Sequence, residues 1–142
     1  MEILFVDRAR RKIPTALLRR DIRQVLRAKA NRRARLETIS IISVTAEESR
    51  RLNRQFLNKL RPANVLSFRY DGQSEIVITP TVIFRQARAG GRPYRGEIRR
   101  MVLHGLLHLA GHHHEASGRQ AIIFGKLEQR LLKHLKITSH GK

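Results

Sequence analysis

The chain has 142 residues, of which 41% are apolar, and this length and composition suit one folded domain with a single hydrophobic core. The absence of cysteine excludes disulfides, cysteine-ligated metal and thiol catalysis, and it suits a cytoplasmic protein. Lys and Arg number 30 against 11 Asp and Glu, so the formal net charge is +19, and 23 of the cations are Arg. This charge indicates a nucleic-acid partner, with a solvated surface in an Arg-rich host as the alternative.

Hydrophobic periodicity predicts strands and helices along the chain. Residues 1–7 are apolar without a basic start or a cleavage site, so we expect a first strand and not a signal peptide. Thr45 to Glu48 match a capping box, which predicts the start of a helix. The other predicted elements are helices over 13–30, 80–87, 95–110 and 117–135, and strands over 38–44, 65–68 and 76–78, with a turn at 70–73 and a frayed end over 136–142.

This order of elements predicts an α+β fold in a single domain over residues 1–142. We expect a small mixed β-sheet of about four strands packed with about five helices. No apolar run approaches the roughly 18 to 20 residues that a membrane span needs.

The most informative pattern is a group of histidines near the end of the predicted helix 95–110. His104 and His108 are four residues apart, so their rings project from one helix face. Gly111 is expected to end the helix in a left-handed cap and to let His114 reach the same point. Three neutral imidazoles leave a fourth position for water, as at catalytic zinc, so we predict a metal on these three residues. The alternatives are surface or core histidines, or a chance run over 112–114, and the choice of His114 within that run rests on spacing.

Two acidic residues and one glycine bear on the chemistry of this group. The same spacing occurs in metzincin proteases, but Gly105 stands where their general base, a glutamate, is found. Glu97 lies seven residues before His104, and it either orients a metal ligand or is an exposed charge near the helix start. Glu115, next to His114, is open to the same two interpretations.

The histidine segment resembles the signature of the YbeY family, which are bacterial metal-dependent endoribonucleases. The family pattern H-G-x-L-H-L-x-G-x-D-H is similar to residues 104–114, with His113 in place of the usual Asp. Leu52-Asn53 and then Pro62-Ala63-Asn64-Val65-Leu66-Ser67-Phe68 are similar to the family's L-N-x-x-Y-R and P-T-[DN]-V-L-S-F. A weaker similarity joins residues 75–78 to the family's G-D-[IL]-x-I. The resemblance extends over about residues 52–115.

The resemblance implies an α+β fold, one Zn²⁺ per chain on His104, His108 and His114, and cleavage of single-stranded RNA. It also implies 16S rRNA 3′-end maturation and ribosome quality control in the cytoplasm. The implied partners are ribosomal RNA, the small ribosomal subunit and ribosome-associated proteins, without a membrane. Asn64 and Ser67 would lie near the cleft, either as substrate contacts or as packing and hydrogen-bonding residues.

Besides His113, a further position departs from the family pattern, and it matters more. The family's Arg falls on Leu57. The resemblance implies that this Arg stabilises the charge of the phosphate or of the transition state, and a leucine side chain cannot stabilise such charge. Arg54, one turn earlier, and Arg61, in the following loop, are the candidate catalytic residues that could replace the family's Arg. An ordinary surface role is the alternative for both.

We therefore expect metal-assisted phosphodiester cleavage, with water or a neighbouring 2′-hydroxyl as the nucleophile. Aromatic residues make up only 5% of the chain, so we expect little base stacking and little sequence preference. Two alternatives remain. One is a metal-dependent hydrolase of another substrate, including a peptidase. The other is a non-catalytic or weakly active, metal-stabilised rRNA-binding ribosome assembly factor, which Leu57 favours.

Overall fold

The structure of the chain is a computed structural model that describes residues 2–29, 38–109 and 118–137. Within these ranges the elements are β1 (Glu2–Asp7), α1 (Thr15–Lys29), β2 (Thr38–Ser43), α2 (Ala46–Leu57), β3 (Val65–Tyr70), β4 (Gln73–Ile78), α3 (Pro80–Ala89), α4 (Tyr94–Leu109) and α5 (Gly118–His134). The predicted α+β domain with about four strands and five helices is confirmed. Among the described helices, none combines the length and the apolar character that a membrane crossing needs.

The strands form one mixed sheet in the order β1-β2-β4-β3. β2 runs parallel to both β1 and β4, whereas β3 and β4 are antiparallel. The hairpin between β3 and β4 turns through Asp71 and Gly72, whose φ angles are 34° and 81°. Positive φ at both residues is typical of a two-residue turn that matches the twist of the strands. Both strands therefore continue to the turn and are longer than the predicted 65–68 and 76–78.

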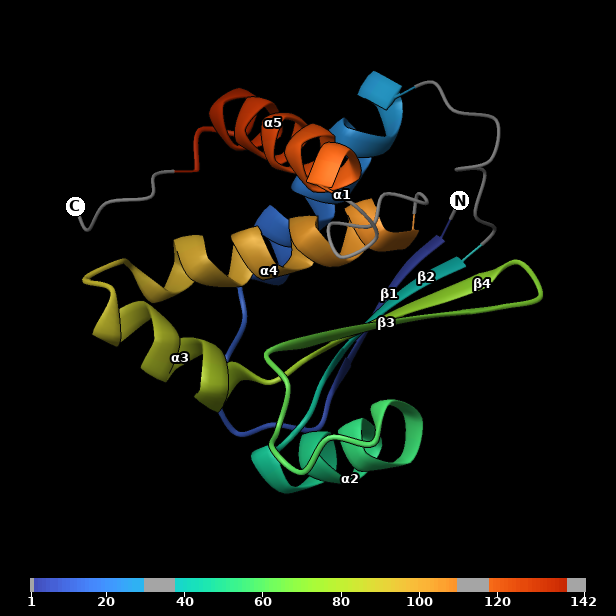
Figure 1. Cartoon of the computed structure of the whole chain (residues 1–142), viewed down its shortest axis with the longest axis vertical. Coiled ribbons are helices and arrows are strands. Elements are labelled where there is room, and N and C mark those ends of the chain that lie inside the picture. The colour runs from blue at the N-terminus through green and yellow to red at the C-terminus, as the bar shows by residue number, and fades with distance from the viewer. Residues whose placement is uncertain (1, 30–37, 110–117, 138–142) are drawn as a thin grey trace.

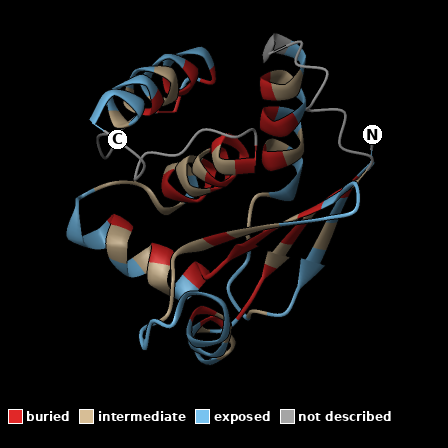
Figure 2. Ribbon diagram, turned by 45° about the vertical axis from the view of Figure 1, so that its right-hand side comes forward, coloured by how far each residue is buried: buried red, intermediate tan, exposed pale blue. Residues whose placement is uncertain are grey.

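Helices cover both faces of this sheet (Figure 1). α1, α4 and α5 lie on one side, and α2 lies alone on the other. Ile39 and Ile41 of β2 are fully buried in the larger core, on the α4 side. A smaller cluster of Val44, Leu66 and Val77 lies on the α2 side. Figure 2 shows that buried residues follow the central strands and the helix sides that face them.

α4 is the central helix, because it contacts β3, β4, α1, α3 and α5. Its buried Arg99 donates to both carboxylate oxygens of Asp21 on α1, at 2.6 and 2.9 Å. The same guanidinium donates to the carbonyl oxygen of Leu135, just after α5, at 2.8 Å. This buried ion pair joins the three helices and fixes the position of α4 relative to them.

The ends of the helices test the finer predictions. The Thr45 hydroxyl accepts a hydrogen bond from the backbone N–H of Glu48 at 3.1 Å, so the predicted start of α2 is confirmed. The predicted fraying from residue 136 is wrong for Ile137, which is buried and donates its N–H to the carbonyl of Leu132 at 2.9 Å. Burial of this apolar side chain stabilises the segment after α5 as far as residue 137. The predicted cap at Gly111 lies outside the described residues.

Candidate metal centre

His104 and His108 lie one turn apart on the last two turns of α4, as the sequence predicted. Their Nε2 atoms are 3.2 Å apart and their ring centroids are 4.8 Å apart. Both side chains are only partly buried, although the helix around them is largely buried. The two ring nitrogens therefore converge on one point that remains accessible from outside.

Glu128 on α5 orients the ring of His104. This glutamate was not predicted from the sequence. Its Oε2 accepts a hydrogen bond from Nδ1 of His104 at 2.8 Å, and the two side chains are only 19% and 25% exposed. Phe124, one turn earlier, packs against both histidine rings, with centroid distances of 5.0 and 5.3 Å. The signal in the sequence was an acid within an apolar stripe, because Glu128 shares the helix face of Phe124, Leu131 and Leu135.

This geometry fits a bound zinc ion. Two nitrogens that share a tetrahedral zinc at about 2.0–2.1 Å each lie about 3.3 Å apart. The observed Nε2 separation of 3.2 Å in the His104–His108 pair agrees with this value. When Glu128 accepts a hydrogen bond from the Nδ1–H of His104, the Nε2 of that ring keeps its lone pair for a metal. The same spacing also suits a hydrogen bond between the two Nε2 atoms in the metal-free pair.

The complete ligand set extends beyond the described residues. Within the described ranges, no three His, Asp or Glu side chains gather into a metal site. The predicted third ligand, His114, lies outside these ranges together with His112, His113 and Glu115. His114 therefore stays a prediction from spacing.

A cleft of about 950 Å³ opens beside the two histidines. Its described wall consists of the end of α2, the loop that follows, strand β3, part of α3 and the last turns of α4. Three cationic residues lie in the wall, namely Lys59, Arg61 and Arg69. Because cations line the cleft next to the histidine pair, a phosphodiester backbone suits it in charge.

Leu57 and the two arginines that were predicted to replace the family's Arg occupy different places. Leu57 lies in the cleft wall and is 52% exposed. Arg61 also lies in the wall, whereas Arg54 is exposed on α2 and is not part of the described wall. Lys59 and Arg69 also lie in the wall, and neither was predicted as a site residue. A loop and an edge strand have no hydrophobic periodicity that indicates where their side chains point.

Asn64 and Ser67 line the cleft, and their side chains also hold the scaffold together. The Ser67 hydroxyl donates to the carbonyl oxygen of Gly105 on α4 at 3.1 Å. The Asn64 amide donates to Gln86 of α3 at 2.9 Å, and its oxygen accepts from the N–H of Val65 at 2.7 Å. Contact of either residue with a substrate stays a prediction.

Glu97 has neither of the two roles considered for it. It is buried, and its carboxylate accepts hydrogen bonds from Arg92, Arg100 and Gln86 at distances of 2.6 to 3.2 Å. Burial raises the pKa of Glu97, but the hydrogen bonds from Arg92 and Gln86 and the charge of Arg100 outweigh it and hold the pKa below its ordinary value. The carboxylate turns toward the start of α4 and toward α3, two turns away from His104.

Gly105 faces the sheet, and this position excludes a catalytic side chain there. A Cβ atom at Gly105 would lie 2.9 Å from Cγ2 of Ile76 and 3.0 Å from Oγ of Ser67. No glutamate fits in this space, so the general base of a metzincin protease has no place in this helix. The peptidase alternative loses its support.

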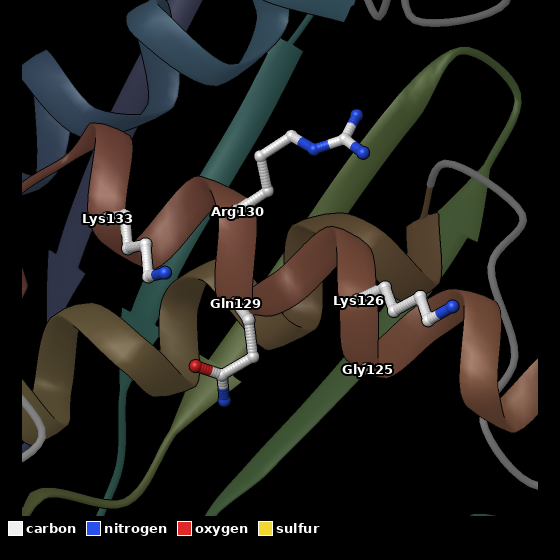
Figure 3. A pocket seen from close by; sticks show the side chains of 5 residues that line it. All are labelled: Gly125, Lys126, Gln129, Arg130 and Lys133. Carbon is white, nitrogen blue, oxygen red and sulfur yellow. The ribbon is translucent and has the colours of Figure 1, made fainter.

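A second, smaller hollow of about 470 Å³ runs along the outer side of α5 (Figure 3). Its described lining consists of Gly125, Lys126, Gln129, Arg130 and Lys133, which the figure shows spread along the helix. Neither a histidine nor a carboxylate is among these lining residues, so they offer no metal ligand and no general base. The cleft beside His104 and His108 is therefore the candidate active site.

Comparison with known proteins agrees with this description. The model of the family described as Endoribonuclease YbeY matches residues 4–136. The protein named Endoribonuclease YbeY from Thermodesulfovibrio yellowstonii is 36% identical over 106 residues, which cover 69% of this chain and 67% of that protein. The one from Aromatoleum aromaticum is 36% identical over 131 residues, or 89% of this chain and 80% of that protein.

The fold is also similar to a solved structure. The solution structure of TM1509 from Thermotoga maritima matches with a TM-score of 0.61 and 22% sequence identity, over 96% of this chain and 92% of that chain. At this level of identity the match concerns the fold alone.

An α+β domain with two histidines in the wall of a cleft lined by cations resembles a hydrolytic enzyme. The chain belongs to the endoribonuclease YbeY family, and this membership makes it a nuclease. The resemblance found in the sequence is thereby confirmed.

Proposed function

We propose that the chain is a zinc-dependent endoribonuclease that cuts single-stranded RNA. The observation that carries this proposal is the pair of converging Nε2 atoms, 3.2 Å apart, at the wall of a cationic cleft. The proposed ligands are His104, His108 and His114, and the last is included from sequence spacing. Family membership supports the choice of RNA as the substrate.

The residues of the cleft have separate tasks in the proposed reaction. A bound zinc ion supplies Lewis acidity, which makes a water molecule more acidic and offsets negative charge on a phosphoryl oxygen. His104 and His108 hold the ion, and Glu128 keeps the His104 ring in the required tautomer. Arg61 and its neighbouring cations in the wall bind the backbone and stabilise charge that develops on the phosphate.

The proposed role in the cell is maturation of the 16S rRNA 3′ end and ribosome quality control on the small ribosomal subunit in the cytoplasm. The family resemblance supports this role. The net charge of +19 supports an RNA partner, because it concentrates polyanions near the protein.

The test is cleavage of a single-stranded RNA that carries the 16S rRNA 3′-end sequence, compared with the same sequence in a duplex. We expect cleavage of the single strand only, and we expect a chelator or the His104→Ala/His108→Ala double substitution to abolish it. Arg61→Ala is expected to lower the cleavage rate by about 10- to 100-fold, because the wall loses a charge-stabilising group. Cleavage that persists in chelator would contradict the proposal.

A second candidate function is a non-catalytic or weakly active rRNA-binding assembly factor with a structural metal. The observation that favours it is Leu57, which is exposed in the cleft where the family pattern has Arg. RNA binding that survives replacement of the histidines, together with no cleavage by the parent, would select this function.

A further inference from the structure

We propose that Phe56, Phe68 and Tyr70 form a platform on which bases of single-stranded RNA stack as the strand enters the cleft. The inference rests on the proposed cleavage of RNA and adds a binding subsite to it. It also revises the expectation of minor stacking, because aromatic residues are few in the chain yet three of them gather at this one place.

The three rings come from two elements and form a continuous row. Phe68 and Tyr70 lie two residues apart on β3, with their rings stacked at a centroid distance of 6.3 Å and an interplanar angle of 16°. Phe56, near the end of α2, meets Phe68 at a centroid distance of 5.0 Å and an angle of 59°. The row therefore crosses from the edge strand of the sheet to α2.

Packing of the core accounts for only one of these rings. Phe68 is partly buried against the cluster of Val44, Leu66 and Val77, so it anchors the row. Phe56 and Tyr70 remain 49% and 48% exposed. Two large rings that stay half exposed to water add little to the core and are accessible to a planar ligand.

The platform is continuous with the candidate active site. Phe68 lies in the wall of the cleft that also contains His104 and His108. Arg69 lies between Phe68 and Tyr70 on β3 and is also part of the wall. Because side chains alternate along a strand, the rings lie on one face of β3 and the cation on the other. A strand of RNA that crosses this edge places its bases against the rings and its phosphates near Arg69. The cations beside the rings favour a polyanionic ligand over an apolar protein partner.

The test measures the binding of two fluorescent oligonucleotides by anisotropy over a series of salt concentrations. One is single-stranded RNA, and the other has the same backbone without bases. We expect the Phe56→Leu/Tyr70→Leu variant to bind the intact RNA about 5- to 100-fold more weakly than the parent. The abasic backbone should bind equally well to both proteins, and the salt dependence should not change, because no cation is removed.

The control is Ile122→Ala/Ile123→Ala on α5, which alters exposed apolar residues away from the platform and should bind both oligonucleotides like the parent. Melting temperatures of all proteins show whether each variant is folded. Unchanged binding of intact RNA, or an equal loss for the abasic backbone, would overturn the platform. A variant that binds RNA normally but no longer sediments with the small ribosomal subunit would show a protein-docking surface and overturn it too. A parent that neither binds nor cuts RNA would instead refute the proposed function.

Discussion

Glu128 connects the two helices that build the candidate metal centre, because its carboxylate accepts a hydrogen bond from Nδ1 of His104 at 2.8 Å. We predict that Glu128→Gln lowers the zinc affinity of the protein by about 10- to 100-fold, since the ring loses its charged partner and its fixed tautomer. The measurement is competition for zinc with a chromophoric chelator. Glu47→Gln removes an exposed acid on α2 and is the matched control. Equal affinity in the Glu128 variant and the parent would show that the contact has no influence on the metal.

Leu57 stands where the family pattern inferred from the sequence has Arg, and it lies in the wall of the cleft. We predict that Leu57→Arg raises the rate of RNA cleavage by about 10-fold or more, because a guanidinium there stabilises charge on the phosphate. Leu60→Arg adds the same charge at a neighbouring residue that is 74% exposed. A single-turnover assay of both variants separates a local effect from a general one. An equal rise in both, or none in the first, would count against a catalytic position at 57.

Glu97 gives the stability of the fold a predictable dependence on pH. Its pKa in the folded protein lies below the ordinary value of 4.5, so its contribution is complete above that value and is lost as the pH falls through the lowered pKa. We predict that Glu97→Gln lowers the free energy of unfolding at pH 7 by about 2 kcal/mol, because Arg92 and Arg100 lose their counter-charge.

Urea unfolding at pH 7 and at pH values below 4 checks this prediction. The difference between parent and variant should shrink as the pH falls through the lowered pKa of Glu97, because the parent carboxyl then becomes neutral. Glu47→Gln should show little difference at either pH, because this exposed acid forms no ion pair with the described residues. A difference that grows in acid would contradict the assigned direction of the pKa shift.

At the scale of elements, the approach of α4 to the sheet positions the histidines. We predict that Gly105→Ala destabilises the protein by about 1–3 kcal/mol, because its Cβ has no space beside Ile76 and Ser67. Gly125→Ala on α5, where a Cβ meets nothing within 4 Å, should instead stabilise it by about 0.5–1 kcal/mol. Unfolding curves of the two variants provide the comparison. Similar effects in both would mean that helix propensity, and not the close approach, governs position 105.

Several elements follow from the sequence because their signals are local. The capping box at Thr45, the Pro80 start of α3 and the apolar periodicity of α1 each act within one element, and each predicted helix exists. The lengths of β3 and β4 were underestimated, because Gln73, Ser74 and Glu75 carry no apolar signal. Their place in the sheet comes from pairing with β3 and β2, which only the assembled sheet provides.

The candidate site shows the same division. His104 and His108 are predictable, since residues four apart on a helix share a face. Glu128 is 24 residues from His104, and their contact depends on how α5 packs on α4. The row of rings at Phe56 and Tyr70 likewise depends on α2 lying beside the edge strand. Composition counts aromatic residues but cannot state that three of them meet.

At the scale of the whole molecule, exposed positive charge lies on described helices at both faces of the sheet. Exposed Arg residues lie on α1, α2 and α3, and basic residues also line the outer side of α5. Charge spread in this way attracts RNA from all directions and makes binding sensitive to salt. Under the proposed function, the cleft with its histidines and local cations then determines where the RNA is cut.

We propose that one metal ion on the α4 histidines enables the enzyme to cut RNA. The most direct test is to add zinc stepwise to metal-free protein and to follow the rate of single-stranded RNA cleavage. We expect no cleavage without metal, a rate that rises to a plateau at one zinc per chain, and no response in the His104→Ala/His108→Ala variant. Full cleavage by the metal-free protein, or an equal zinc response in that variant, would contradict it.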